Sequence, residues 1–185
     1  LAWNYHHEGA WQWAADTFAR VVDQEDTALA APATYYRAVN LRRAEDLTGA
    51  VDAYRTYLRS YHDHRLADRG QLELGITLYE LRQWQRARDA FAELVETYPD
   101  SEVAGEAWKH LGNTEIALGN FDAAHEAFDA AIAAGTADPS LAMEIIFQRA
   151  WLNYRTARYT EAAEQFMVLF EQQEGIEAGE ALLGC

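Results

Sequence analysis

Cysteine, proline and serine are scarce in this chain of 185 residues, and each scarcity excludes something. The only cysteine is Cys185, the last residue, so no disulfide can form within the chain. Three prolines are too few to interrupt the chain often, and Pro32, Pro99 and Pro139 all fall at boundaries between predicted repeat units. None of the few serines stands in a sequence typical of a serine nucleophile, so we expect no catalytic serine.

Basic residues are also few: 15 lysines and arginines stand against 30 acidic residues, which gives a net charge of −15. An acidic chain repels phosphate backbones, so binding to nucleic acid is not expected. We interpret the acidic side chains as the solvated outer faces of helices, although a basic partner or a salt-rich habitat would also explain them. No apolar run is long enough to cross a membrane, so we expect no direct membrane insertion by this segment.

Motifs that would indicate a ligand or a reaction are missing as well. There is no glycine-rich loop that could hold a phosphate. His62 and His64 are two residues apart and do not share a helix face, so we interpret them as part of a solvated loop and not as metal ligands. The many carboxylates recur at predicted surface positions, and no catalytic pair can be picked out. The sequence therefore predicts no enzyme activity, no cofactor and no metal.

The stretch from Leu74 to Ser101 shows the pattern on which the chain is organised. Apolar residues recur at three- and four-residue steps before and after Leu81–Gln83, which predicts two amphipathic helices around a short turn. A small residue at Gly75 lets the second helix cross close to the first, and Phe91 fills the space beside the crossing. Pro99 cannot continue the second helix.

This pattern recurs five times in register, at intervals of 36, 37, 37 and 38 residues. Four columns of residues keep step. They are a small residue on the first helix (Ala2, Ala38, Gly75, Gly112, Ala150), an aromatic residue or leucine at the turn (Trp11, Leu47, Trp84, Phe121, Tyr159), an alanine on the second helix (Ala14, Ala50, Ala87, Ala124, Ala162) and an aromatic residue after it (Phe18, Tyr54, Phe91, Phe128, Phe166). We predict that the alanine and the final aromatic columns are buried.

Over essentially its whole length the chain resembles the tetratricopeptide repeat family, most clearly at Trp108–Leu111–Gly112 and at Leu74–Gly75. Arginine stands at the family's leucine in two units, and the period exceeds the family's usual 34 or so residues, so we place the extra residues between units. The resemblance implies an all-α fold, a right-handed superhelical solenoid of antiparallel helix pairs with about four complete units and partial units at both ends.

The predicted solenoid is a single body over residues 1–185. Its units are expected at about 1–30, 31–66, 67–100, 101–138 and 139–175, with the start of a further helix at 176–185. Within them, we expect a helix to begin at Pro32, Thr48 to cap the next, Asp138–Pro139 to begin a long helix, and the last closing helix to end near Gly175.

The phrase from Tyr98 to Gly112 resembles the longer-period repeats of bacterial envelope proteins, such as the Tol–Pal coordinator protein and the lipoprotein of outer-membrane barrel assembly. This resemblance suggests the periplasm or cell envelope, while the cytoplasm stays open. Two functions follow as hypotheses. The first is a protein–protein interaction scaffold that binds a peptide or helix of unknown identity in a concave groove. The alternative is an adaptor region of a larger envelope enzyme or export machine whose activity lies outside this segment.

In repeats of this family the opening helices line the concave surface, so the resemblance implies a set of groove residues. We select Tyr35, Arg42, Tyr79, Lys109, Asn113, Trp151 and Tyr154. The aromatic residues could anchor a partner, and Arg42 and Lys109 could hold an acidic group or a peptide carboxylate. Lys109 and Asn113 resemble the carboxylate-clamp type of the family, but the other units lack this pair. The alternative is a tight superhelix in which several of these residues belong to the core.

Both ends of the sequence align with the middle of a helix, which suggests a segment of a longer protein. We therefore expect Trp3, Trp11 and Trp13 at one end, and Leu182–Leu183 at the other, to expose surface that a neighbouring unit would cover. Self-association through these ends is a further expectation.

Overall fold

The computed structural model describes the backbone of residues 1–22, 27–136 and 138–183, and the side chains of these residues except 27 and 172–183. Every regular element in the described residues is an α-helix, as predicted. The chain forms two compact units, Leu1–Val103 and Ala104–Cys185. The prediction of one continuous body over residues 1–185 stays a prediction.

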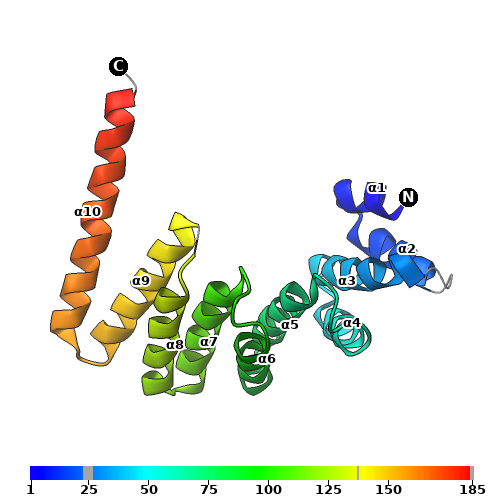
Figure 1. The fold of residues 1–185 in the computed structure, drawn as a ribbon, viewed down its shortest axis with the longest axis horizontal. Coiled ribbons are helices and arrows are strands. Elements are labelled where there is room, and N and C mark those ends of the chain that lie inside the picture. Colours follow the sequence, from blue (N-terminus) through cyan, green and yellow to red (C-terminus); the bar gives the residue numbers. More distant parts are fainter. Residues whose placement is uncertain (23–26, 137, 184–185) are drawn as a thin grey trace. The chain divides into compact units, whose positions relative to one another are not determined.

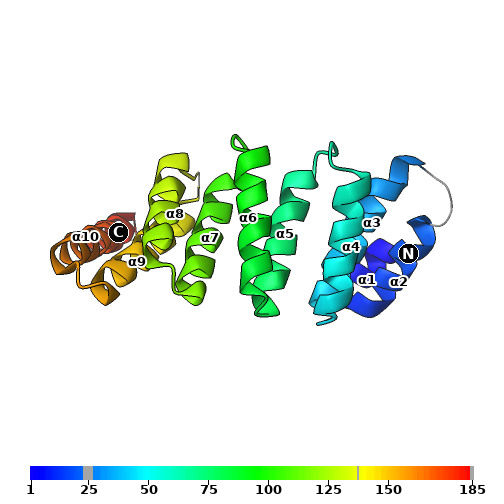
Figure 2. The same cartoon turned by 90° about the horizontal axis from the view of Figure 1, so that it is seen from below.

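The first unit holds three helix pairs (Figures 1 and 2). Their helices are α1 (Ala2–His7), α2 (Trp11–Val22), α3 (Thr27–Arg43), α4 (Leu47–Ser60), α5 (Ala67–Glu80) and α6 (Trp84–Thr97). Each helix packs against the next along the chain from α1 to α6, and α3 also packs against α5. Figure 2 shows α4, α5 and α6 side by side.

The second unit holds two helix pairs, made by α7 (Ala104–Leu118), α8 (Phe121–Ala134), α9 (Pro139–Arg155) and α10 (Tyr159–Leu183). Here too each helix packs against the next, and α7 also packs against α9. Gly135, with a φ of 69°, ends α8, and the side chain of Asp138 accepts a hydrogen bond from the Ser140 N–H at the start of α9. The start of α9 confirms the sequence prediction, since aspartate caps helices, and glycine is favoured at the end of α8 because its φ is positive.

The repeated columns form the crossing inside each helix pair. All five alanines of the second-helix column are buried, and so are the five small residues of the first-helix column. A Cβ added at Gly75 would lie 2.4 Å from the ring of Phe91, and one added at Gly112 would lie 2.9 Å from the ring of Phe128. Both rings are fully buried. The predicted reason for a small residue at the crossing is therefore confirmed.

The final aromatic column is buried in four pairs, but Phe166 is only half-buried, so its prediction as a core residue is corrected. Ring contacts join Phe166 to two exposed residues, Phe147 at 6.1 Å and Trp151 at 6.4 Å between centroids. Phe166 therefore belongs to a partly solvated surface.

Three helix boundaries differ from the sequence prediction. Pro32 lies inside α3 and not at its start, because the alanine-rich segment before it has high helix propensity. The cap of α4 is Asp46, which accepts a hydrogen bond from the Gly49 N–H at 2.9 Å, and not Thr48. The closing helix does not end near Gly175, since α10 continues to Leu183 and includes the described part of the further helix predicted at 176–185.

Candidate functional site

In the first unit, Tyr35 does not line an accessible surface, which corrects its assignment to the groove. Its side chain is 8 % exposed and packs edge-to-face on Tyr54 and Tyr57 of α4. Burial raises the pKa of the Tyr35 hydroxyl to about 12. This residue belongs to the core between α3 and α4.

Arg42 at the end of α3 is held by two carboxylates of α5. Its Nη1 donates to Glu73 at 2.7 Å, and its Nε and Nη2 form a forked pair with Glu80 at 3.1 and 2.6 Å. The hydrogen bond that Arg42 donates to Glu80 raises the pKa of the guanidinium, although partial burial opposes this. Arg42 therefore joins α3 to α5, and an acidic ligand would have to compete with Glu73 and Glu80 for it.

Tyr79 of α5 is half-buried beside the turn to α6. Its ring lies edge-to-face on Trp84, with 4.7 Å between centroids. Tyr79 thus has some accessible ring surface, although the structure does not assemble it with Tyr35 into one exposed aromatic face.

In the second unit, Lys109 is buried, which corrects the prediction that it could serve as an accessible cation. Its side chain on α7 is 8 % exposed, and its Nζ lies 3.0 Å from the Glu144 carboxylate of α9. A buried ammonium needs such a partner, because removing an unpaired charge from water is costly. Asn113, one turn later on α7, is half-buried.

Trp151 and Tyr154 of α9 are exposed, at 45 % and 53 %, and their rings lie 5.6 Å apart in an edge-to-face contact. Phe147, one turn before Trp151, is exposed as well. Positions 147, 151 and 154 follow the spacing of one helix face. Of the predicted groove residues, only Trp151 and Tyr154 therefore form an exposed cluster with each other.

Two further aromatic residues join this cluster from α10. Phe166 contacts both Phe147 and Trp151, and Tyr159 contacts Tyr154 with 5.7 Å between ring centroids. We call the set Phe147, Trp151, Tyr154, Tyr159 and Phe166 the α9/α10 aromatic surface. The sequence interpretation missed the last two, because it assigned them to the repeat columns and not to a binding face.

The α9/α10 aromatic surface continues into a shallow groove. Met143 and Phe147 of α9 line one side, and Phe166, Leu169 and Phe170 of α10 line the other. Among the described lining residues Glu144 is the only charged one, and it is the partner of Lys109. An apolar groove with exposed rings can bury apolar side chains of a partner, and the tyrosine hydroxyls can hydrogen-bond at its edge.

Two classes of feature are absent from the described part of the chain. No group of three or more histidine, cysteine, aspartate or glutamate residues is placed to hold a metal ion. Among the described helices, none combines the length and the apolar character that a membrane crossing requires.

Comparison with known proteins identifies the repeat. A model of the tetratricopeptide repeat matches residues 41–102, 72–139 and 109–169, which together span more than half of the chain. No curated protein matches the sequence. This match to the general repeat does not show whether the chain belongs to the longer-period envelope type that the phrase from Tyr98 to Gly112 resembles.

Solved structures share the fold. MamA from Desulfovibrio magneticus RS-1 superposes with a TM-score of 0.77 at 18 % identity, covering 94 % of this chain and 92 % of MamA. BtubC from P. vanneervenii superposes with a TM-score of 0.82 at 17 % identity, covering 96 % of this chain and 78 % of BtubC. At these identities the likeness shows the fold alone.

Proposed function

Since the chain belongs to the tetratricopeptide repeat family, we propose that it is a protein-interaction scaffold that binds a partner segment through the α9/α10 aromatic surface. Helical repeats of this kind present extended surfaces to other proteins and are generally not enzymes. The observation that carries the proposal is the exposure of Phe147, Trp151 and Tyr154 on one face of α9.

The number of exposed aromatic residues on and beside the α9/α10 aromatic surface requires a functional explanation. Tyr159 is 62 % exposed, and Phe170 beside the groove is 61 % exposed. Contiguous apolar patches on soluble proteins mark interaction sites more often than scattered apolar residues do. Tryptophan and tyrosine are also enriched among the residues that dominate binding energy, because they bury a large area at low entropic cost.

The shape of the surface favours a helical or extended peptide with apolar side chains. The three rings on α9 span about two helical turns, and the groove between α9 and α10 continues the same face. A partner helix with apolar residues at three- and four-residue spacing would place its side chains between these rings. We therefore expect recognition by shape and apolar contact, with few charged contacts.

A peptide library offers the sharpest test, because the natural partner is unidentified. Peptides with helical apolar spacing would be selected for binding to the intact chain, and their dissociation constants measured by fluorescence anisotropy. We expect Trp151→Ala to weaken the selected peptide by about 2 kcal/mol or more, with unchanged helix content by circular dichroism.

The matched control is Trp13→Ala, which removes an equally large exposed ring, 67 % exposed, from the first unit. This control should bind the peptide as wild type does. Equal loss in both variants, or full binding by Trp151→Ala, would contradict the proposal. Sedimentation showing a dimer that Trp151→Ala abolishes would instead assign the surface to self-association.

A further inference from the structure

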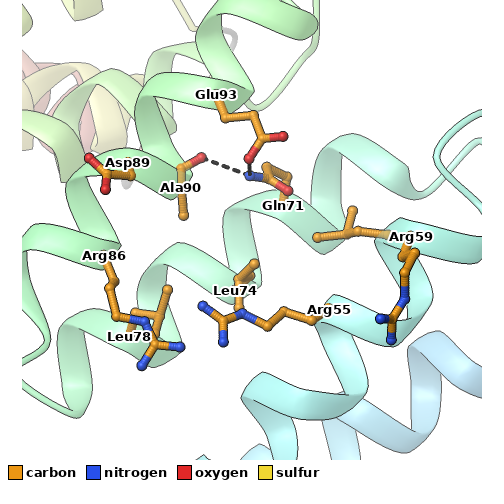
Figure 3. A pocket seen from close by; sticks show the side chains of 10 residues that line it. Arg55, Arg59, Gln71, Leu74, Leu78, Arg86, Asp89, Ala90 and Glu93 are labelled. Atoms are coloured by element: carbon orange, nitrogen blue, oxygen red, sulfur yellow. Dashed lines mark hydrogen bonds between the residues drawn. The ribbon is translucent and has the colours of Figure 1, made fainter.

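A second, chemically different groove lies on the first unit, between α4, α5 and α6 (Figure 3). It has a volume of about 360 Å³. Leu58 of α4 and Leu74 and Leu78 of α5 supply its apolar lining. Figure 3 shows the side chains of Arg55 and Arg59 extending from α4 and that of Arg86 from α6. A leucine-lined groove with three arginines differs from the aromatic surface of α9 and α10.

The arginines of this groove are available to a ligand. Arg55 and Arg59 are one turn apart on α4 and exposed, and among the described side chains neither forms an ion pair. Among the described side chains of this unit, the arginines that pair with carboxylates are Arg42, Arg69 and Arg88. Arg86, also exposed, donates only to the neutral amide oxygen of Gln83 among the described partners.

Two carboxylates also line the groove: Asp89 is in an ion pair, whereas Glu93 keeps its charge and accepts a hydrogen bond from a neutral amide. Asp89 lies 2.7 Å from Arg88, the residue before it on α6. Glu93 accepts a hydrogen bond of 2.8 Å from the side chain of Gln71, which also donates to the Ala90 carbonyl at 3.1 Å. The groove therefore offers an occupant more unpaired positive charge than negative charge, on a chain with a net charge of −15.

We propose that this groove binds an acidic peptide segment that carries apolar side chains. Arginine forms forked hydrogen bonds with carboxylates, so Arg55 and Arg59 can hold two acidic residues one helical turn apart. Leucine side chains of the same segment can cover Leu58, Leu74 and Leu78. Nucleic acid fits less well, because its repeated phosphates would meet Asp89, Glu93 and the acidic surface of the rest of the chain.

This site is independent of the α9/α10 aromatic surface, since it uses other helices in the other unit. The two surfaces also differ in what they recognise. The aromatic surface selects apolar shape, whereas the arginine-lined groove selects negative charge next to apolar side chains. A partner could carry segments for both surfaces, or two partners could bind separately, and either arrangement fits a scaffold.

The test uses the intact chain and a short fluorescein-labelled peptide of glutamate and leucine, followed by fluorescence anisotropy at low and high salt. We expect Arg55→Gln/Arg59→Gln to weaken binding by about tenfold at low salt, since each exposed charge pair contributes modestly and the two add. High salt should weaken the wild type more than this variant. Glu93→Gln should strengthen binding by about twofold, because it removes a repulsive charge.

The matched control is Arg20→Gln/Arg37→Gln, which removes the same charge from exposed positions of α2 and α3 outside the groove. Binding by this control should stay within about twofold of wild type. Equal weakening in the groove and control variants would overturn the proposal, as would no binding of the peptide by wild type. Tighter binding of a single-stranded oligonucleotide, of anionic phospholipid vesicles or of a lysine–leucine peptide would overturn it too.

Discussion

The helix pairs α5/α6 and α9/α10 are built on the same columns, but the aromatic residues of α5/α6 are more deeply buried than those of α9/α10. In α5/α6, Phe91 is fully buried, and Tyr79 and Trp84 at the turn are half-buried. The equivalent residues in α9/α10 are Phe166, which is half-buried, and Tyr154 and Tyr159, which are exposed at 53 % and 62 %. Both pairs keep the same edge-to-face contact at the turn.

This comparison separates two kinds of position in a repeat. Column residues such as Ala87 and Ala162 fill the crossing within a pair, so they are buried in both pairs. The aromatic residues differ: Phe166 and Tyr159 belong to the columns and Tyr154 does not, yet all three are more exposed than their counterparts in α5/α6. A repeat can therefore keep its fold while one pair turns an aromatic face to solvent, and that face is available for binding.

The largest expected effect is in the aromatic column. Phe91→Ala should lower the free energy of unfolding by about 3–5 kcal/mol, because it empties a fully buried ring site. Phe166→Ala should cost only about 1–2 kcal/mol, because water already reaches that ring. Urea denaturation followed by circular dichroism would measure both. Equal losses of unfolding free energy would show that the rings of Phe91 and Phe166 are equally buried, which would contradict the comparison.

The next largest effect on the free energy of unfolding is expected at the crossing of α5 and α6. Gly75→Ala should destabilise by about 1–3 kcal/mol, since the added Cβ would lie 2.4 Å from the Phe91 ring and force it to move. In α9/α10 the same column already holds Ala150 opposite the half-buried Phe166. If urea denaturation showed that Gly75→Ala stabilises the chain, as this change does in open helices, the close contact at this crossing would be wrong.

The tyrosine core of α3 and α4 should make the first unit sensitive to alkaline pH. Burial raises the pKa of Tyr35 to about 12, above the value of about 10 in an unfolded chain. The fold therefore favours the neutral hydroxyl, and this stability is complete below pH 10 and lost as pH rises toward 12.

The expected loss is about 1–3 kcal/mol over this interval. Burial raises the pKa of Tyr54 and Tyr57 as well, so they add to it. Urea denaturation at several pH values would measure the loss, and Tyr35→Phe should reduce it. An unchanged pH dependence in Tyr35→Phe would show that Tyr35 does not contribute to the loss of stability at alkaline pH.

The smallest effect concerns the exposed face. Trp151→Ala should lower the free energy of unfolding by only about 1 kcal/mol, because nearly half of the side chain is already in water. Tyr79→Ala should cost about 1–2 kcal/mol, since its half-buried ring packs on Trp84. Thermal and urea unfolding would compare the two variants. A large loss in Trp151→Ala would make Trp151 a structural residue and weaken its assignment to binding.

The sequence was sufficient for the fold because the repeat is encoded locally. Gly75, Ala87 and Phe91 meet within one pair, so their spacing alone predicts their contact. The sequence leaves open whether Tyr35 and Lys109 line the groove or belong to the core, because burial depends on neighbouring helices, whose distance no spacing gives; the structure places both in the core. For the same reason Trp151 could be proposed as a groove residue, but its exposure could not be distinguished from that of Tyr79.

The arginine-lined groove was missed for a different reason. The sequence indicates solvated outer faces on the helices, and no motif in it gives Arg55 and Arg59 a role. The spacing of the two arginines was no signal by itself, because Arg65/Arg69 and Arg82/Arg86 are also four residues apart. What the sequence could not supply was the position of α6, which brings Arg86 beside them.

The contact between Gly75 and Phe91 also has a consequence for sequence variation. The small residue and the ring are 16 positions apart, and the same separation joins Gly112 to Phe128 and Ala150 to Phe166. Because the two members share one space, a larger residue at one should be tolerated when the other shrinks. The volumes of the two residues in each pair are therefore coupled. A designer could move both residues of a pair together from one repeat to another, but not one of them alone.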